Sequence, residues 1–311
     1  MNTLMRPVPA LPADIVVFER GWLSSNNILL RAGPVAALVD SGYCTHAEQT
    51  LALVQAALGR QPLDLLLNTH LHSDHCGGNA LLQQSYPAMQ TLIPPGLAAH
   101  VRDWDAHALT FEPTGQQCPP FRFDGLLQPG NTLRLGARNW QIHAAKGHDP
   151  HSVILFDPAS RTLISADALW EGGFGIVFPE LEGLNAFDEV AGTLDVIESL
   201  QPACVIPGHG PVFTDVTAAL HTARRRLAGF VAAPSKHTRY AAKVLLKFKL
   251  LEAQQMPWQD LLDWVDGTEH MRTLHRLAAP SPPFPDWVAD LLDELVASGA
   301  AARSGDAVSN S

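Results

Sequence analysis

Four side chains that commonly bind metals lie within six residues of one another, and they constrain this chain more than any other feature: His70, His72, Asp74 and His75. They follow an apolar segment, residues 63–68, that predicts a buried strand, and they precede a helical segment. Side chains alternate with a period of two in an extended segment, so His70 and His72 project to the same side and can share one metal ion. Asp74 and His75 lie where the chain turns into the helix, from where they can reach a second ion.

The alternative is that these are ordinary core or surface histidines. The chain has 14 His among 311 residues, and at that frequency the pattern H-x-H-x-D-H arises by chance in roughly one chain of this length in a thousand. The run therefore predicts a metal site at the carboxyl end of a strand, which is where α/β sheets usually place their functional groups.

Short apolar runs alternate with helical stretches from residue 15 to about residue 212, as expected of a layered α/β domain. The segments that predict strands are 15–18, 27–31, 35–40, 63–68, 139–144, 152–156, 162–165 and 204–206. The segments that predict helices in this region are 47–58, 79–86 and 187–200. Residues 86–129, which are rich in proline and irregular, are expected to cover the site.

The pattern changes after about residue 215, where helical segments follow one another. They are expected at 218–232, 238–254, 258–265 and, after a proline-rich break at 280–285, at 286–298. A weak strand pattern at 301–308 is compatible with a short β-wing. We therefore predict a catalytic domain over residues 1–218 and a small, mostly helical domain over residues 219–311.

Composition and charge exclude several classes of protein. Lys and Arg number 21 against 31 Asp and Glu, a net charge of −10, and the one dense basic cluster, Arg224–Arg226, is most simply a solvated helix face. Nucleic acid is therefore not an expected partner. The N-terminal fourteen residues contain no apolar targeting region, and no later apolar stretch is long enough to span a bilayer. We expect a cytoplasmic protein without a membrane partner.

The four cysteines do not indicate a thiolate metal site or a disulfide framework. Cys44, Cys76, Cys118 and Cys204 are scattered and form no C-x-x-C pair, which favours a reducing compartment. Cys76 follows His75 directly, but a small buried thiol at the start of a helix explains it better than a nucleophile does.

Three later segments offer further metal ligands. His148, Asp167 and His209 each come just after a predicted strand, beside a glycine or another small residue that lets the backbone approach closely. Taken singly, His148 is equally well a loop or capping residue, Asp167 a helix N-cap and His209 a turn residue. Their shared position at strand ends favours one common site.

With this ordered series, the chain over about residues 14–215 resembles the metallo-β-lactamase superfamily, in particular its glyoxalase II-like hydrolase branch. The resemblance implies an αββα sandwich with the site at one edge of the two sheets. It also implies a ligand set for two metals, in which the first is bound by His70, His72 and His148, the second by Asp74, His75 and His209, and Asp167 bridges both.

This resemblance implies a dinuclear hydrolase that acts through a metal-bridging hydroxide, since two cations lower the pKa of a shared water. Asp74 is the candidate catalytic residue, as an acceptor of the hydroxide proton, although it is also explained as a ligand alone. Zinc suits a histidine-rich site without thiolates, while iron or manganese is also compatible with imidazole and carboxylate ligands.

A small acyl metabolite, carried as a thioester, ester or lactone, is the expected substrate. Trp170 and Phe174 are candidate walls of an apolar cleft, although ordinary core packing also explains them. His151 stands where close relatives have a glycine, and it is a candidate for the substrate entrance. A phosphodiesterase or nuclease, an iron-dependent oxidoreductase and a metal-binding module without turnover remain as alternatives. A homodimer is left open.

Overall fold

The computed structural model describes residues 11–278 and 282–311, and its centre is a pair of β-sheets. The expectation for the first ten residues, and part of that for the proline-rich break, lie outside this range. The first sheet runs in the order β1 (Ile15–Phe18), β2 (Asn27–Leu30), β3 (Ala37–Val39), β4 (Leu65–Leu67), β5 (Gln90–Ile93) and β6 (Gly125–Leu126). The second runs in the order β11 (Cys204–Pro207), β10 (Thr162–Ala166), β9 (Val153–Asp157), β8 (Arg138–Ala144) and β7 (Thr132–Leu135).

Strand direction decides which strand ends meet at one edge. Strands β3, β4, β5 and β6 run parallel to one another, as do β10 and β11 in the second sheet. The remaining pairs in both sheets are antiparallel. The carboxyl ends of neighbouring parallel strands therefore lie side by side, which is the arrangement that the sequence predicted for the site.

The two sheets pack face to face because their strands alternate side chains between two buried layers. In β2, Ile28 and Leu30 belong to the core between the sheets, whereas Leu29 faces the outer layer. The inner core also takes Trp140 of β8 and Leu155 of β9, all fully or almost fully buried. Strands β2 and β9 are buried along their whole length, as expected of strands covered on both faces, whereas β8 alternates buried and more exposed side chains.

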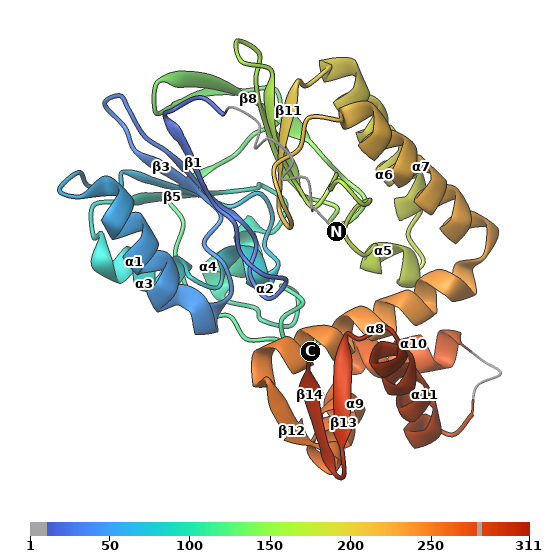
Figure 1. Ribbon diagram of the computed structural model, residues 1–311. Coiled ribbons are helices and arrows are strands. Elements are labelled where there is room, and N and C mark those ends of the chain that lie inside the picture. The colour runs from blue at the N-terminus through green and yellow to red at the C-terminus, as the bar shows by residue number, and fades with distance from the viewer. Residues whose placement is uncertain (1–10, 279–281) are drawn as a thin grey trace, which may run out of the picture.

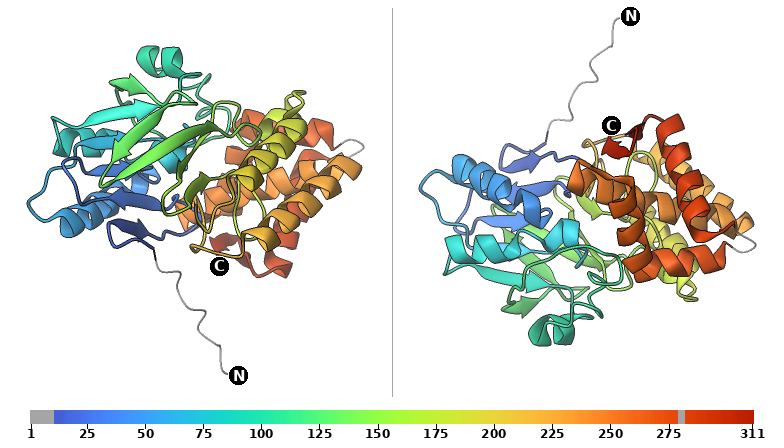
Figure 2. Two further views of the ribbon diagram at one scale, coloured as in Figure 1. Left: turned by 90° about the horizontal axis from the view of Figure 1, so that it is seen from above. Right: turned by 90° about the horizontal axis from the view of Figure 1, so that it is seen from below.

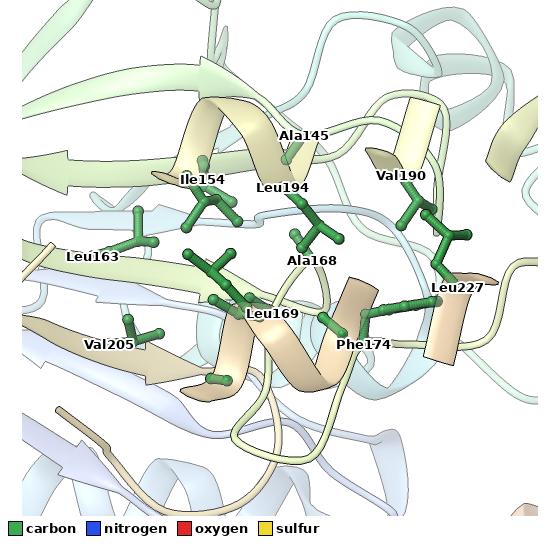
Figure 3. Packing of buried hydrophobic residues seen from close by; sticks show 14 of the residues in the cluster. Ala145, Ile154, Leu163, Ala168, Leu169, Phe174, Val190, Leu194, Val205 and Leu227 are labelled. Carbon is green, nitrogen blue, oxygen red and sulfur yellow. The ribbon is translucent and has the colours of Figure 1, made fainter. Parts of the chain in front are cut away.

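Helices cover the outer face of each sheet and complete the αββα sandwich. On the first sheet lie α1 (Ala47–Leu58) and α3 (Asn79–Ser85), and on the second lie α6 (Ala186–Leu200) and α7 (Val216–Ala232) (Figure 1). Figure 3 shows the second of these layers, where Ile154 and Leu163 of the sheet meet Leu194 of α6. Full burial of such a side chain contributes about 1.5–3 kcal/mol to folding.

The C-terminal region is a helical unit with a small antiparallel sheet. It contains α8 (Pro234–Ala253), β12 (Gln255–Pro257), α9 (Trp258–Gly267), α10 (Glu269–Leu277), α11 (Phe284–Ala297), β13 (Ala301–Ser304) and β14 (Ala307–Asn310). Its strands pair in the order β12-β14-β13, and Leu246, Leu261 and Trp287 lie in its own core. Figure 2 shows this unit, in orange and red, beside the sandwich.

The predicted boundary at residue 218 falls inside α7. Leu220 and Ala223 of this helix pack with α6 in the outer layer of the sandwich, and the C-terminal core takes residues from α8 onward. Ile176 reaches the C-terminal core from the loop after β10. The two regions are therefore joined by packing as well as by the chain.

The remaining helices are short: a 3-10 turn η1 (Cys44–His46), α2 (Ser73–Cys76), α4 (Ala98–Asp103) and α5 (Phe178–Leu181). Strands β5, β6 and β7 and helix α10 were not predicted from the sequence. Within the described residues, no helix is both long enough and apolar enough to cross a membrane.

Candidate metal centre

The predicted histidine run lies at the carboxyl end of β4, where the chain enters α2. The backbone of His72 is extended, with φ −68° and ψ 148°, and the short helix α2 starts directly after it. His70 and His75 are completely buried, while Asp74 lines a cavity. The strand end and the short helix therefore direct these side chains toward one edge of the sandwich.

The first group of candidate ligands is His70, His72 and His148. One ring nitrogen from each lies within 4.8 Å of the others, and Nε2 of His70 is 3.0 Å from Nδ1 of His72. His148 comes from the loop between β8 and β9. Its Nδ1 donates to the carbonyl oxygen of Ile176 at 2.5 Å, which leaves its Nε2 facing the group.

The second group contains Asp74, His75, Asp167 and His209, whose ligand atoms also lie within 4.8 Å of one another. Asp167 directly follows β10, and His209 comes just after β11, the parallel neighbour of β10. Nε2 of His209 is 3.0 Å from Oδ2 of Asp74. The parallel pairing of two strands therefore brings together two residues that are distant in the sequence.

Asp167 lies between the two groups and faces both. Its Oδ2 is 3.4 Å from Nε2 of His148, and its Oδ1 is 3.5 Å from Nε2 of His75. One carboxylate thus directs one oxygen to each group. This is the geometry required of a residue that binds two ions at once.

The buried donor set fits metal ions better than it fits a hydrogen-bonded core. Nε2 of His75 and Nε2 of His148 are buried and have no hydrogen-bond partner among the described residues, although buried polar atoms are normally paired. Gly208 supplies the necessary space, because a Cβ on it would overlap Oδ1 of Asp167. Nitrogen and oxygen ligands in two adjacent groups indicate a site for two cations.

The charges around the site favour bound cations. Burial lowers the pKa of His148 to about 4, and burial together with the neighbouring imidazoles lowers that of His70, so both candidate ligands are neutral at pH 7. Burial alone would raise the pKa of Asp167, but the charges of His75 and His209 outweigh it and hold that pKa well below its usual range. An ionised carboxylate close to the neutral rings of His70 and His148 is suited to metal coordination.

Asp40 supports the site but was not singled out from the sequence. It ends the segment that predicted β3, and its Oδ2 lies 2.8 Å from Nδ1 of His75. The same oxygen accepts from Oγ1 of Thr69, and Oδ1 accepts from the Thr69 backbone N–H. A carboxylate on the far nitrogen of a ligand histidine fixes its orientation. An aspartate at the end of the strand beside β4 was the signal available in the sequence.

A cavity of about 560 Å³ extends from the two groups toward the C-terminal region. Trp170 and His151 line it, as the sequence predicted, together with Asp74 and Asp167. The prediction for Phe174 does not hold, because its ring is 1% exposed in the core between the sheet and α7, where Arg226 lies over it. Trp170 also donates from Nε1 to Oδ1 of Asp167 at 3.2 Å.

Sequence reasoning missed two further contributors to the cavity. Trp22, from the loop between β1 and β2, stacks on His209 with ring centroids 5.4 Å apart, and 55% of it is exposed. Helix α8 forms another wall with Tyr240, Val244 and Phe248. The sequence offered no signal that a helix beginning 25 residues after His209 returns to the site.

Comparisons with known proteins agree with this geometry. Residues 20–209 match the sequence model of the metallo-beta-lactamase superfamily. The chain is 33% identical over 161 residues to a hydroxyacylglutathione hydrolase of Jannaschia sp. (strain CCS1), covering 51% of this chain and 53% of that protein. It is 28% identical over 174 residues to an acyl-coenzyme A thioesterase of Gallus gallus, covering 50% of this chain and 59% of that protein. The chain thus spans little more than half the length of these relatives.

Two solved structures are also similar. A metallo-beta-lactamase family protein from Thermus thermophilus aligns with a TM-score of 0.59 and 19% identity, over 97% of this chain and 100% of that one. The protein TTHA1623 in a di-iron-bound form aligns with a TM-score of 0.51 and 28% identity, over 67% of this chain and 98% of that one. The first of these likenesses concerns the fold alone.

Proposed function

Because the chain belongs to the metallo-beta-lactamase superfamily, we propose that it is a dinuclear metal-dependent hydrolase of a small acyl thioester, ester or lactone. The observation that carries the proposal is Asp167, whose two oxygens face two separate groups of candidate ligands at 3.4 and 3.5 Å. His70, His72 and His148 would hold one ion, and Asp74, His75 and His209 the other. Zinc is the proposed metal, because imidazole and carboxylate ligands without thiolates suit it.

The cavity supports an acyl substrate. Trp22, Trp170 and Ile176 lie on the walls nearest the two groups, and Val244 and Phe248 of α8 lie on another wall. Apolar walls with a few polar groups at one end are typical of pockets that bind small organic ligands. An acyl chain would occupy the apolar part, with its carbonyl group at the ligand cluster.

Bound divalent cations would supply Lewis acidity toward the carbonyl group and would lower the pKa of a coordinated water. The residues of the chain supply orientation and proton transfer. Asp74 lines the cavity, and its Oδ2 contacts Nε2 of His209 at 3.0 Å. We assign its Oδ1 to accept a proton and return it to the leaving group. Asp40 holds His75 through Nδ1, so that its Nε2 keeps one direction.

A phosphodiester substrate is less well supported, because the nearby cations are engaged elsewhere. On the cavity wall, Lys243 is 2.8 Å from Glu294, and Lys247 donates to the carbonyl oxygen of Ala300. Lys146 is 3.8 Å from Glu189 and mostly exposed, and Arg161 binds the backbone oxygen of Gln201. The relatives named as a hydroxyacylglutathione hydrolase and an acyl-coenzyme A thioesterase both favour thioesters. We therefore rank thioesters first, with esters and lactones next.

The proposal includes the partner and the compartment. A small acyl compound is the proposed partner, and the net charge of −10 argues against nucleic acid. All four cysteines are free thiols, which supports a reducing compartment such as the cytoplasm.

The first test is metal content. We expect about two equivalents of zinc per chain after expression in supplemented medium, measured by atomic emission. His72→Ala and Asp167→Ala should each lose metal and turnover while keeping the circular dichroism spectrum of the parent. His221→Ala is the matched control, because His221 is exposed on α7. Metal content near zero in the parent would refute the dinuclear site.

The second test is a substrate panel with the zinc-loaded chain. A thioester, an aryl ester, a lactone and bis-p-nitrophenyl phosphate are compared at equal concentration. We expect the thioester to be cleaved fastest. Faster cleavage of the phosphodiester would favour a phosphodiesterase, and dioxygen uptake by an iron-loaded preparation with a thiol substrate would favour an oxidoreductase.

A further inference from the structure

Cys76 and Cys118 lie against each other beside the candidate metal centre, at the end of α2. The proposed chemistry uses neither of them. Sγ of Cys76 is 3.8 Å from Sγ of Cys118, although 42 positions separate them in the sequence. Both are free thiols. We propose that Cys76 and Cys118 form a redox modification site, at which a hydroperoxide converts the two thiols into a reversible disulfide.

The geometry allows the bond with little movement. A disulfide joins its sulfurs at ~2.05 Å, so the two atoms must approach by less than about 2 Å. Cys76 is fixed, since it ends α2 and is completely buried. Cys118 lies in residues 116–123, a segment without regular secondary structure. Most of the adjustment can therefore occur on the side of Cys118.

The exposure of the two thiols indicates which of them reacts with the peroxide first. Cys118 is partly exposed, whereas Cys76 is not. The sulfur of Cys118 attacks hydrogen peroxide, so that an S–O bond forms, the O–O bond breaks and one water leaves. The sulfur of Cys76 then attacks that of Cys118, forming the S–S bond and releasing the second water. The two thiols lose two electrons and two protons, and the peroxide is reduced to two molecules of water.

The position of Cys118 connects this site to the cavity. Two residues earlier, Gln116 lines the cavity and accepts from Oγ of Ser73 in α2 at 2.5 Å. Gly115, directly before this segment, is bound to the C-terminal region, where Nε1 of Trp264 donates to its carbonyl oxygen at 3.3 Å. A disulfide would therefore fasten one wall of the cavity to the helix that carries Asp74 and His75.

Peptide mapping of the zinc-loaded full chain after treatment with hydrogen peroxide tests the proposal. We expect a linked peptide containing Cys76 and Cys118, a mass loss of about 2 Da that dithiothreitol reverses, and no such peptide from Cys118→Ser. Cys204→Ser is the matched control and should form the link like the parent, because Cys204 lies at the start of β11. Pairing with Cys44, or oxidation that stops at single sulfurs, would overturn the proposal.

Hydrogen–deuterium exchange gives a second readout that is independent of hydrolysis. In the oxidised chain, amide exchange should slow at residues 114–118, because the disulfide restricts local opening there. The Cys118→Ser variant should show no change after the same treatment. Unchanged or faster amide exchange in the oxidised parent would contradict the proposed link between the cavity wall and α2. Neither readout depends on the substrate, so a failure here is distinct from a failure of the proposed function.

Discussion

Replacement of Asp40 by asparagine tests whether the metal centre depends on the residue behind it. The carboxylate accepts three hydrogen bonds of 2.8 Å, from the backbone N–H and the hydroxyl of Thr69 and from Nδ1 of His75. Asp40 has φ +60°, a conformation that asparagine tolerates better than most residues. The change therefore removes charge and one acceptor without adding strain to the backbone.

The expected magnitude follows from the buried donors. The amide nitrogen of asparagine cannot accept, so at least one of these donors loses its partner at a cost of about 1–3 kcal/mol. Loss of a residue that orients a ligand histidine lowers metal affinity about 10–100-fold. A tenfold loss corresponds to about 1.4 kcal/mol of binding free energy. The free energy of unfolding of the metal-free protein and the zinc affinity should both fall by these amounts.

The assay is zinc competition with a chromophoric chelator, together with urea unfolding of the metal-free protein. Asp64→Asn is the matched control, because Asp64 accepts from the backbone N–H of Ala36 at the opposite end of β4. It should leave the zinc affinity unchanged. If Asp40→Asn binds zinc within twofold of the parent, the role assigned to Asp40 is incorrect.

Three further predictions concern space, charge and packing. Gly208→Ala should weaken zinc binding at least tenfold in the same competition assay, because the new Cβ would overlap Oδ1 of Asp167; full affinity would contradict that contact. The hydrogen bond from Arg138 holds the pKa of Asp14 below its ordinary value, so this pair stabilises the fold above about pH 4 and less as the pH falls. Asp14→Asn should therefore lower the free energy of unfolding at pH 7 by up to about 1 kcal/mol, and its difference from the parent should shrink in urea titrations as the pH falls below about 4. Leu194→Ala should cost about 2–5 kcal/mol of unfolding free energy, because Leu194 is fully buried in the layer of Figure 3; zinc stoichiometry should not change.

Many strands and helices of the layered α/β domain were predicted because their apolar patterns are local. The αββα sandwich itself was implied by the family resemblance. The bounds predicted at 15–18 and 47–58 are those of β1 and α1, since apolar spacing and flanking turn residues define both ends. Strand β5 was not predicted, because four residues with only two buried positions give too short a pattern. Its place in the sheet depends on pairing with β4, which is a long-range contact.

The same distinction applies to the site. Strand ends could be read from the sequence, and the structure brings His148, Asp167 and His209 to the run at 70–75. The assignment of each as a ligand stays a prediction. Phe174 was misplaced because composition does not tell a cavity wall from a core position when both are apolar. Trp22 was missed because its contact with His209 joins positions that are distant in the sequence. Helix α8 was missed because its approach depends on how the C-terminal region packs on the sandwich.

Helix α8 gives the cavity a wall that comes from a different part of the chain than the candidate metal ligands. Tyr240, Val244 and Phe248 face the cavity, yet they come after the last histidine of the ligand set in the chain. Substitutions in α8 can therefore change the shape of the cavity while the candidate metal ligands stay the same. In a fold of this kind, replacement of the C-terminal region can change which ligands fit the cavity.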